Sequence, residues 1–305
     1  MLMNPAHAPG AYRPRRQSES RFLQLRGLRH HVRVWEPSAD RPLRGTLLML
    51  HGWMDVSASF QFIVDALADN WRVYAPDWRG YGLTDRSGAD SYWFADYLAD
   101  LDRLLDALSP DEPASVVAHS MGGNVAMLYA GVRPERIARL VNLEGMGLPA
   151  TEPSQAPQRY QQWLDELRDP PGPRYFASID EIAQRLMRND PRLSVDKAEF
   201  LGAHWAQALP DGRLELAGDS AHRIVNPVLY RVEEAVACWR QISAPVLLVV
   251  SERFNDWHAF VDSPEYQQRL GVIRELSTVR IEGSGHMLHH DRPDEVARLI
   301  EGFMT

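Results

Sequence analysis

Continuous apolar runs alternate with segments of helical spacing, and this alternation constrains the fold more than any other feature of the chain. Runs of this kind occupy residues 45–50, 114–118 and 244–250. A strand that is apolar on both faces is typical of a parallel sheet covered on both sides. The helical segments between the runs supply that cover. The sequence therefore predicts an α/β fold, with a mostly parallel twisted sheet and helices on both faces.

The alternation is interrupted once, after Gly147. Residues 148–225 show helical and loop-like patterns with no strand candidate, and the alternation then resumes. We therefore predict an α/β core formed by residues 19–147 and 226–305, with an inserted all-helical cap at 148–225. Residues 1–18 are rich in Pro, Ala and Arg and lack periodicity, so we predict a disordered tail there.

Composition excludes several classes of protein. The net charge of −8 over 305 residues lacks the basic surface expected of a protein that binds nucleic acid or an anionic membrane. Cys238 is the single cysteine, so no intrachain disulfide forms and a reducing compartment suits the chain. No apolar run is long enough to span a bilayer, and the N-terminus lacks the apolar stretch of a signal peptide. We expect a cytoplasmic protein.

Ser120 lies where an apolar strand turns sharply into a helix, in the stretch "VVAHSMGGNVAMLYAG". A turn tight enough to expose the serine hydroxyl needs small residues two before and two after it, because the backbone is crowded. Ala118 and Gly122 supply them. Such a turn also leaves backbone N–H groups free at the helix N-terminus, where they stabilise an oxyanion. The pattern predicts a nucleophilic serine.

His286 is the histidine best placed to activate that serine. A serine is a poor nucleophile until a base removes its proton, and histidine suits this role near neutral pH. His286 follows the last apolar strand, lies in a glycine-rich segment and precedes the C-terminal helix. His289 and His290 follow closely, but no carboxylate or cysteine set with metal-ligand spacing accompanies them. We predict no metal site, and the glycine-rich "GYGLTD" does not form a dinucleotide fingerprint, so we predict no cofactor.

Four motifs in this order resemble the α/β-hydrolase family with a lid domain, and the match runs from about residue 21 to the C-terminus: "LHGW" (50–53), "DWRGYGLTD" (77–85), "AHSMGG" (118–123) and "GSGHMLHHDRP" (283–293). The resemblance implies that Ser120 is the nucleophile and His286 the base. It also implies an oxyanion hole formed by the backbone N–H groups of Trp53 and Met121, with the insertion acting as the lid.

The acid that completes the triad has two main candidates. In most of the family, an Asp follows a Gly at the end of the sixth core strand, but Ser251 replaces that Gly here and the expected positions hold no carboxylate. Asp256 lies just beyond, and one extra loop residue would bring it into place. Glu144 ends the strand that follows the helix after Ser120. Some members of the family have their acid at this position. Glu252 is a weaker third candidate.

The nucleophile narrows the predicted chemistry to acyl transfer. Epoxide hydrolases and haloalkane dehalogenases of this fold attack with an Asp, whereas Ser120 suits hydrolysis of an ester, thioester or lactone through an acyl-serine. Trp163, Trp205, Tyr160 and Met187 of the insertion suit the core of the lid better than substrate contact. Any of them that face the site would favour a small-molecule substrate with an apolar or aromatic acyl group. The alternatives are a cofactor-independent dioxygenase or carbon–carbon bond hydrolase acting on an aromatic substrate, and a ligand-binding receptor on the same fold.

Overall fold

The central feature of the computed structural model is one twisted sheet. The structure describes residues 11–145, 147–252 and 260–305. The strand order is β1-β2-β4-β3-β5-β6-β10-β11; β2 is antiparallel to β1 and β4, and the other pairings are parallel. The strands are β1 (Glu19–Leu25), β2 (Leu28–Trp35), β3 (Gly45–Leu50), β4 (Trp71–Pro76), β5 (Ala114–His119), β6 (Ile137–Leu143), β10 (Val246–Ser251) and β11 (Leu276–Ile281).

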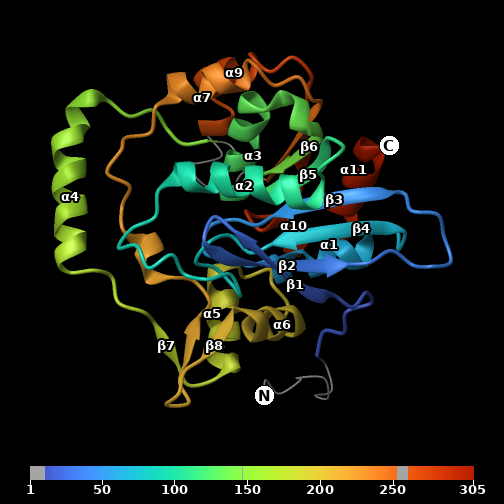
Figure 1. The fold of residues 1–305 in the computed structure, drawn as a ribbon, viewed down its shortest axis with the longest axis horizontal. Helices are drawn as coiled ribbons and strands as arrows, with labels where there is room; N and C mark the ends of the chain where they lie inside the picture. The colour runs from blue at the N-terminus through green and yellow to red at the C-terminus, as the bar shows by residue number, and fades with distance from the viewer. Residues whose placement is uncertain (1–10, 146, 253–259) are drawn as a thin grey trace.

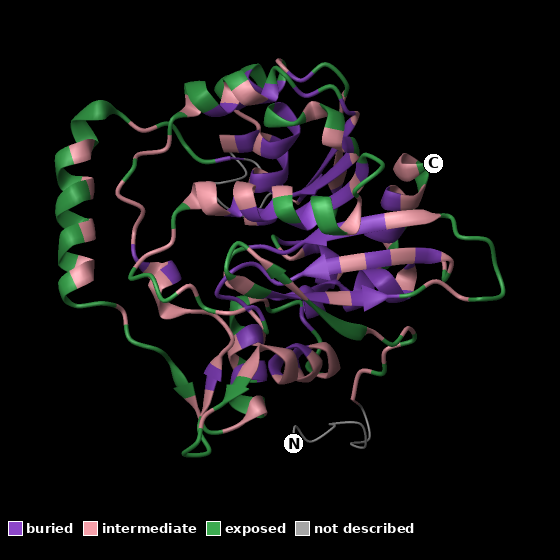
Figure 2. Cartoon of the chain, in the orientation of Figure 1, coloured by how far each residue is buried: buried purple, intermediate pink, exposed green. Residues whose placement is uncertain are grey.

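Helices bury both faces of this sheet (Figures 1 and 2). Neighbouring residues of a strand point to opposite faces, so Val116 joins one apolar cluster and Val117 the other. The first cluster includes α2 (Phe94–Leu108), α3 (Met121–Val132), α7 (Val232–Trp239) and α9 (Pro264–Leu270), and the second includes α1 (Gln61–Ala66), α10 (Leu288–Asp291) and α11 (Pro293–Met304). The predicted parallel sheet with two helical layers is confirmed.

The insertion between β6 and β10 differs from the prediction of an all-helical cap. It contains α4 (Ala156–Arg168), α5 (Ile179–Asn189) and α6 (Val195–Trp205), but also a small sheet in the order β7-β9-β8. Its antiparallel strands are β7 (Tyr175–Phe176), β9 (Leu214–Leu216) and β8 (Ala206–Ala208). Strands of two or three residues are too short to show an alternating pattern, which explains why the sequence did not reveal them.

The cap is anchored to the core through a third apolar cluster. Ile182 of α5 and Leu201 of α6 pack in it with Phe62 of α1. The helix α4, by contrast, lies apart from the sheet at the left of Figure 1, and none of its residues is buried. The cap is therefore held to the core through α5 and α6, and also through residues 217–222, where Gly218 forms a β-bridge with Tyr81 and the ring of His222 stacks on that of Tyr81.

The N-terminal segment also differs from the prediction. Residues 1–10 lie outside the described part of the chain, but residues 11–18, predicted to be disordered, contact the core. The hydroxyl of Tyr12 and the backbone N–H groups of Arg15 and Arg16 donate hydrogen bonds to the carboxylate of Asp65, at 2.7 to 3.0 Å. The ring of Tyr12 also packs edge-on against Phe62, with centroids 4.8 Å apart. The buried carboxylate of Asp65 needs hydrogen-bond donors. No pattern in the sequence around Asp65 predicts that it is buried, or that residues 12–16 supply the donors.

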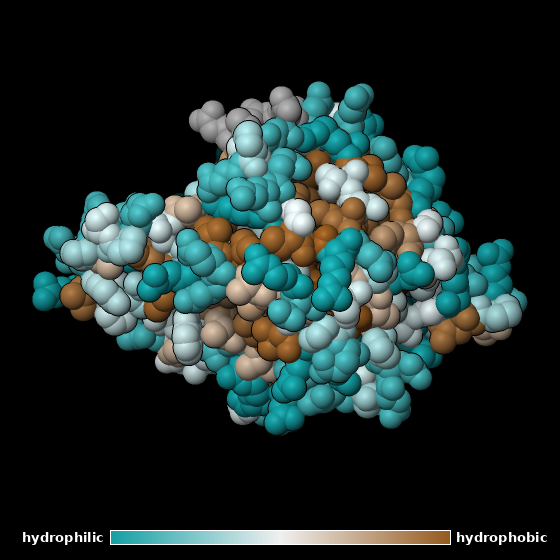
Figure 3. Space-filling view, turned by 90° about the horizontal axis from the view of Figure 1, so that it is seen from above, coloured by the Kyte–Doolittle hydropathy of each residue, from teal (hydrophilic) through white to brown (hydrophobic). Residues whose placement is uncertain are grey.

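On one face of the molecule, seen from above in Figure 3, hydrophilic side chains surround a more hydrophobic middle. No helix in the described part of the chain combines the length and the hydropathy that crossing a bilayer requires.

Two glycines in helices provide a matched test of the packing between α3 and α7. A Cβ added at Gly131 of α3 would overlap the backbone carbonyl of Cys238, whereas one added at Gly302 of α11 meets nothing within 4 Å. We expect Gly131→Ala to lower the free energy of unfolding by about 1–3 kcal/mol, because overpacking forces the helices apart. Gly302→Ala should raise it by about 0.5–1 kcal/mol through helix propensity. Urea denaturation measures both, and equal effects would contradict the described packing.

Candidate active site

Ser120 occupies a strained turn between β5 and α3. Its φ of 50° and ψ of −114° lie in a region that residues other than glycine rarely adopt. A Cβ added at Gly122 would lie 2.7 Å from the carbonyl oxygen of His51, and one added at Gly123 would lie 2.9 Å from the Cα of Gly145. The elbow thus packs against the ends of two neighbouring strands, which is why small residues follow the serine.

The structure brings Ser120, His286 and Glu144 into one hydrogen-bonded chain. The Oγ atom of Ser120 lies 3.0 Å from Nε2 of His286. The Nδ1 atom of the same imidazole lies 3.2 Å from Oε2 of Glu144. The three residues follow β5, β11 and β6, so they meet because parallel strands present their carboxyl ends at one edge of the sheet.

Glu144 is held in place by the backbone around it. The residue has a φ of 62°, directly after β6, and its side chain is buried. Its N–H donates to the carbonyl of Val249 at 3.0 Å, and its Oε1 accepts a hydrogen bond from the N–H of Ser251, both in the adjacent strand β10. These contacts leave Oε2 directed at the imidazole of His286.

Among the described residues, Glu144 is the candidate acid in contact with His286, and the other two candidates are Asp256 and Glu252. Asp256 lies outside the described residues. Glu252 accepts a hydrogen bond from the N–H of Gly283 at 2.7 Å, so its carboxylate is engaged at the end of β11.

Trp53 and Met121, predicted to supply the oxyanion-stabilising N–H groups, both lie close to Ser120 in the fold. Trp53 follows β3 and Met121 begins α3, directly after the serine. Because β3 pairs with β5, with Leu50 opposite Ala118, the two segments leave adjacent points of the sheet. The role of their backbone N–H groups as an oxyanion hole remains a prediction.

A cavity of about 370 Å³ opens beside Ser120 and His286. The cap supplies an apolar part of its wall: Leu186, Leu193, Leu201, Trp205 and Leu216. Of the aromatic residues in the insertion, Trp205 thus reaches the cavity.

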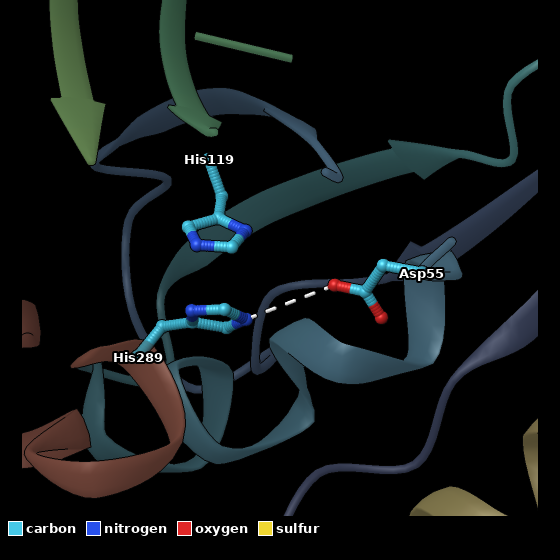
Figure 4. Close-up of side chains that lie close together, drawn as sticks. All are labelled: Asp55, His119 and His289. Carbon is cyan, nitrogen blue, oxygen red and sulfur yellow. Dashed lines mark ion pairs between the residues drawn. The ribbon is translucent and has the colours of Figure 1, made fainter. Parts of the chain in front are cut away.

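Asp55, His119 and His289 form a buried polar cluster next to the serine (Figure 4). One potential ligand atom from each lies within 4.8 Å of the others, and Oδ2 of Asp55 is 3.9 Å from Nε2 of His289. Sequence reasoning missed this group because its members come from three segments far apart in the chain, and Asp55 belongs to none of the motifs.

The ligand atoms of this cluster lie farther apart than those of a zinc site. Bonds of about 2.0–2.1 Å in a tetrahedral zinc site place the ligand atoms about 3.3 Å apart, closer than these atoms lie. Burial lowers the pKa of His119 and His289 and raises the pKa of Asp55 to about 7. A neutral imidazole can bind a metal, so the wide spacing and the raised pKa of the Asp55 carboxyl are the reasons why we assign no metal to the cluster.

The imidazole of His51 braces the segment that leads to Trp53. The backbone N–H of Trp78 donates to its Nε2 at 3.0 Å, and its Nδ1 lies 2.8 Å from the carbonyl of Gly52 and donates to it. Both nitrogens are thus satisfied by the neutral imidazole. Burial lowers the pKa of His51 to about 4.

Comparisons with known proteins agree with this architecture. The family model described as the alpha/beta hydrolase fold matches residues 45–293, and the chain belongs to this family of hydrolases. The chain is 28% identical over 291 residues to a serine hydrolase-like protein of Danio rerio, covering 92% of this chain and 85% of that protein. It is 26% identical to epoxide hydrolase 1 of Caenorhabditis elegans, covering 94% and 70% of the two chains. Among solved structures, the thioesterase domain from the curacin biosynthetic pathway is similar, with a TM-score of 0.78, 27% identity, and 93% and 99% coverage.

The neutral state of His51 makes stability depend on pH. Its pKa is about 4 in the folded protein and about 6.5 in the unfolded chain, so the unfolded chain takes up a proton first as the pH falls. The neutral imidazole of His51 therefore contributes fully to stability above pH 6.5. As the pH falls from 6.5 to 4, the free energy of unfolding decreases by about 3 kcal/mol. We expect the difference in unfolding free energy between wild type and His51→Gln to shift by this amount between pH 7 and 4. Parallel pH profiles of the two proteins in urea denaturation would refute the assignment.

Proposed function

We propose that the protein is a serine hydrolase that cleaves an ester, thioester or lactone of a small molecule through an acyl-serine intermediate. The observation that carries the proposal is the chain of contacts from Ser120 Oγ to His286 Nε2, and from His286 Nδ1 to Glu144 Oε2. This arrangement has the geometry by which a base activates a serine and a carboxylate orients the base.

In the proposed reaction, Nε2 of His286 takes the hydroxyl proton as Ser120 Oγ attacks the substrate carbonyl carbon. The negative oxygen of the tetrahedral intermediate is stabilised by the N–H groups of Trp53 and Met121. The intermediate collapses, and His286 returns the proton to the departing alcohol or thiol. Water then attacks the acyl-serine as His286 takes its proton, and His286 returns that proton to Ser120 Oγ as the carboxylic acid leaves. Throughout, Glu144 accepts the Nδ1–H bond and stabilises the imidazolium.

We assign the acid to Glu144 in preference to Asp256. Three features support this choice: burial, the anchoring N–H of Ser251, and the 3.2 Å contact with His286. A buried carboxylate at the end of an apolar strand costs free energy unless it has partners, and the imidazole provides one.

The cavity wall supports a substrate with an apolar or aromatic acyl group. Leucines of the cap and Trp205 present apolar surface to the space beside Ser120. The likeness to an epoxide hydrolase does not change the proposed chemistry, because epoxide hydrolases of this fold form their ester on an Asp and this chain has Ser120 at the elbow.

Replacing the proposed nucleophile tests the reaction class. We expect wild type to hydrolyse short p-nitrophenyl esters and to be labelled covalently by a fluorophosphonate probe. Ser120→Ala should lose both properties while keeping the circular dichroism spectrum of wild type. A wild-type protein that is inert towards esters, thioesters and lactones and is not labelled would overturn the proposal. Tight ligand binding with at most one turnover would favour a receptor, and oxygen consumption with an aromatic substrate would favour a dioxygenase.

Paired substitutions test the acid. Glu144→Gln should lower kcat by about 10⁴-fold, because the imidazole loses the acceptor that sets its tautomer. Asp256→Asn serves as the matched control and should remain within about tenfold of wild type. The opposite ranking of the two variants would assign the acid to Asp256, and near-normal rates in both would show that the triad is misplaced.

A further inference from the structure

Three arginines of the cap line the cavity that also contains Ser120 and His286. Arg174 directly precedes β7, Arg185 lies in α5, and Arg223 ends the short helix η4 (Ser220–Arg223). Three cationic side chains from three separate segments of the insertion thus line one cavity, whose wall also contains apolar side chains and the acidic residues Asp55, Asp190 and Glu215.

Among the described residues, these arginines form no ion pair with a carboxylate. In the part of the chain that the structure describes, none of the three has a carboxylate oxygen within 4.0 Å. Glu215, an acidic residue of the same cavity, instead pairs with Arg86 at 2.6 Å. Arg223 donates through Nη2 to the backbone carbonyls of Pro171 and Gly172, while its buried Nε atom has no partner among the described residues.

The three charges also repel one another. Burial and the neighbouring charges of Arg174, Arg188 and Arg223 lower the pKa of Arg185. Burial and Arg174 likewise lower the pKa of Arg223. Like charges held together in a partly buried site cost free energy, and a bound anion removes that cost. The guanidinium group is suited to this, because its planar set of donors matches a carboxylate or phosphate.

The apolar wall next to the arginines restricts what kind of anion fits. Leu186 follows Arg185 in α5, and Leu193, Leu201 and Leu216 line the same cavity. A small hydrated ion would leave these leucines facing water. A molecule with an apolar chain and one anionic group satisfies both parts of the wall.

We infer that the cavity selects substrates that carry an anionic group, a carboxylate or a phosphate, in addition to the bond that is cleaved, and that Arg185 and Arg223 with Arg174 recognise it. The inference rests on the proposed function, since it places the anion in the substrate of Ser120. The anionic group belongs either to the acyl part or to the alcohol or thiol part of that substrate, and the experiment below separates these two positions.

Two matched pairs of substrates test charge selection. The first is the p-nitrophenyl monoester of adipic acid with its counterpart in which the free carboxylate is a carboxamide, so that the charge lies on the acyl side. The second is the butanoyl thioester of 3-mercaptopropionate with that of 3-mercaptopropionamide, with the charge on the thiol side. We expect kcat/KM to favour the anionic member of at least one pair by about tenfold or more, after subtraction of the uncatalysed rate. The preference should shrink as NaCl is added. Equal rates within both pairs would overturn the inference.

Arginine variants test which residues carry the preference. Arg185→Gln and Arg223→Gln should each reduce the ratio of anionic to neutral kcat/KM towards one, mainly through KM of the anionic substrate. Arg188→Gln is the matched control: it removes a charge from the same helix α5, but Arg188 is not among the residues that line the cavity. Its ratio should fall much less than in the other two variants, because Arg188 does not contact the bound anion and its charge acts only through space. A ratio unchanged in the first two variants, or reduced equally in all three, would refute specific recognition.

A binding measurement separates failure of the inference from failure of the proposed function. In the Ser120→Ala protein, calorimetry should show tighter binding of the anionic than of the neutral member for at least one of two ligand pairs: monomethyl adipate with its carboxamide, and the butanoyl thioester of 3-mercaptopropionate with that of 3-mercaptopropionamide. Arg185→Gln in that background should abolish the difference. Charge-selective binding without hydrolysis by wild type would preserve the anion site and overturn the hydrolase proposal. Ester hydrolysis without charge selectivity in either assay would preserve the hydrolase proposal and overturn the anion site.

Discussion

The close approach of α3 to the ends of β3 and β6 is the constraint on which the site depends. The helix begins directly after Ser120, and it can do so only because Gly122 and Gly123 present no side chain to the neighbouring backbone. This approach forces the positive φ of the serine and raises its hydroxyl above the sheet. Without it, the serine would follow an ordinary turn, and the histidine delivered by the last strand would find no partner.

The position of the proposed acid follows from the order of the strands. Because β6 lies between β5 and β10, a residue at its carboxyl end is flanked by the elbow on one side and by Ser251 on the other. Ser251 holds one carboxylate oxygen of Glu144, and the second meets His286, whose other ring nitrogen contacts Ser120. A chain that places its acid here does not need a glycine at position 251.

The sequence predicted those parts of the protein that rest on repeated or local patterns. The buried strands, the two helical layers, and the roles suggested for Ser120 and His286 could be inferred because apolar runs and turn residues act within a few positions of one another. The choice between Glu144 and Asp256 could not be made, since it depends on contacts between residues far apart in the chain. The same holds for the small sheet of the cap, for the contact of Tyr12 with Asp65, and for the cluster of Asp55, His119 and His289.

The origin of the three proposed catalytic groups also bears on how the site assembles. Ser120 and Glu144 belong to one continuous strand–helix–strand unit, β5-α3-β6, whose strands pair directly. Contacts within such a unit are short-range along the chain and close with a small loss of loop entropy. His286 arrives from the other end of the polypeptide, after the whole cap has been traversed. Nucleophile and acid therefore come from one local unit, whereas the contacts that hold the acid, with Val249 and Ser251, and the base itself come from the part of the chain that follows the cap.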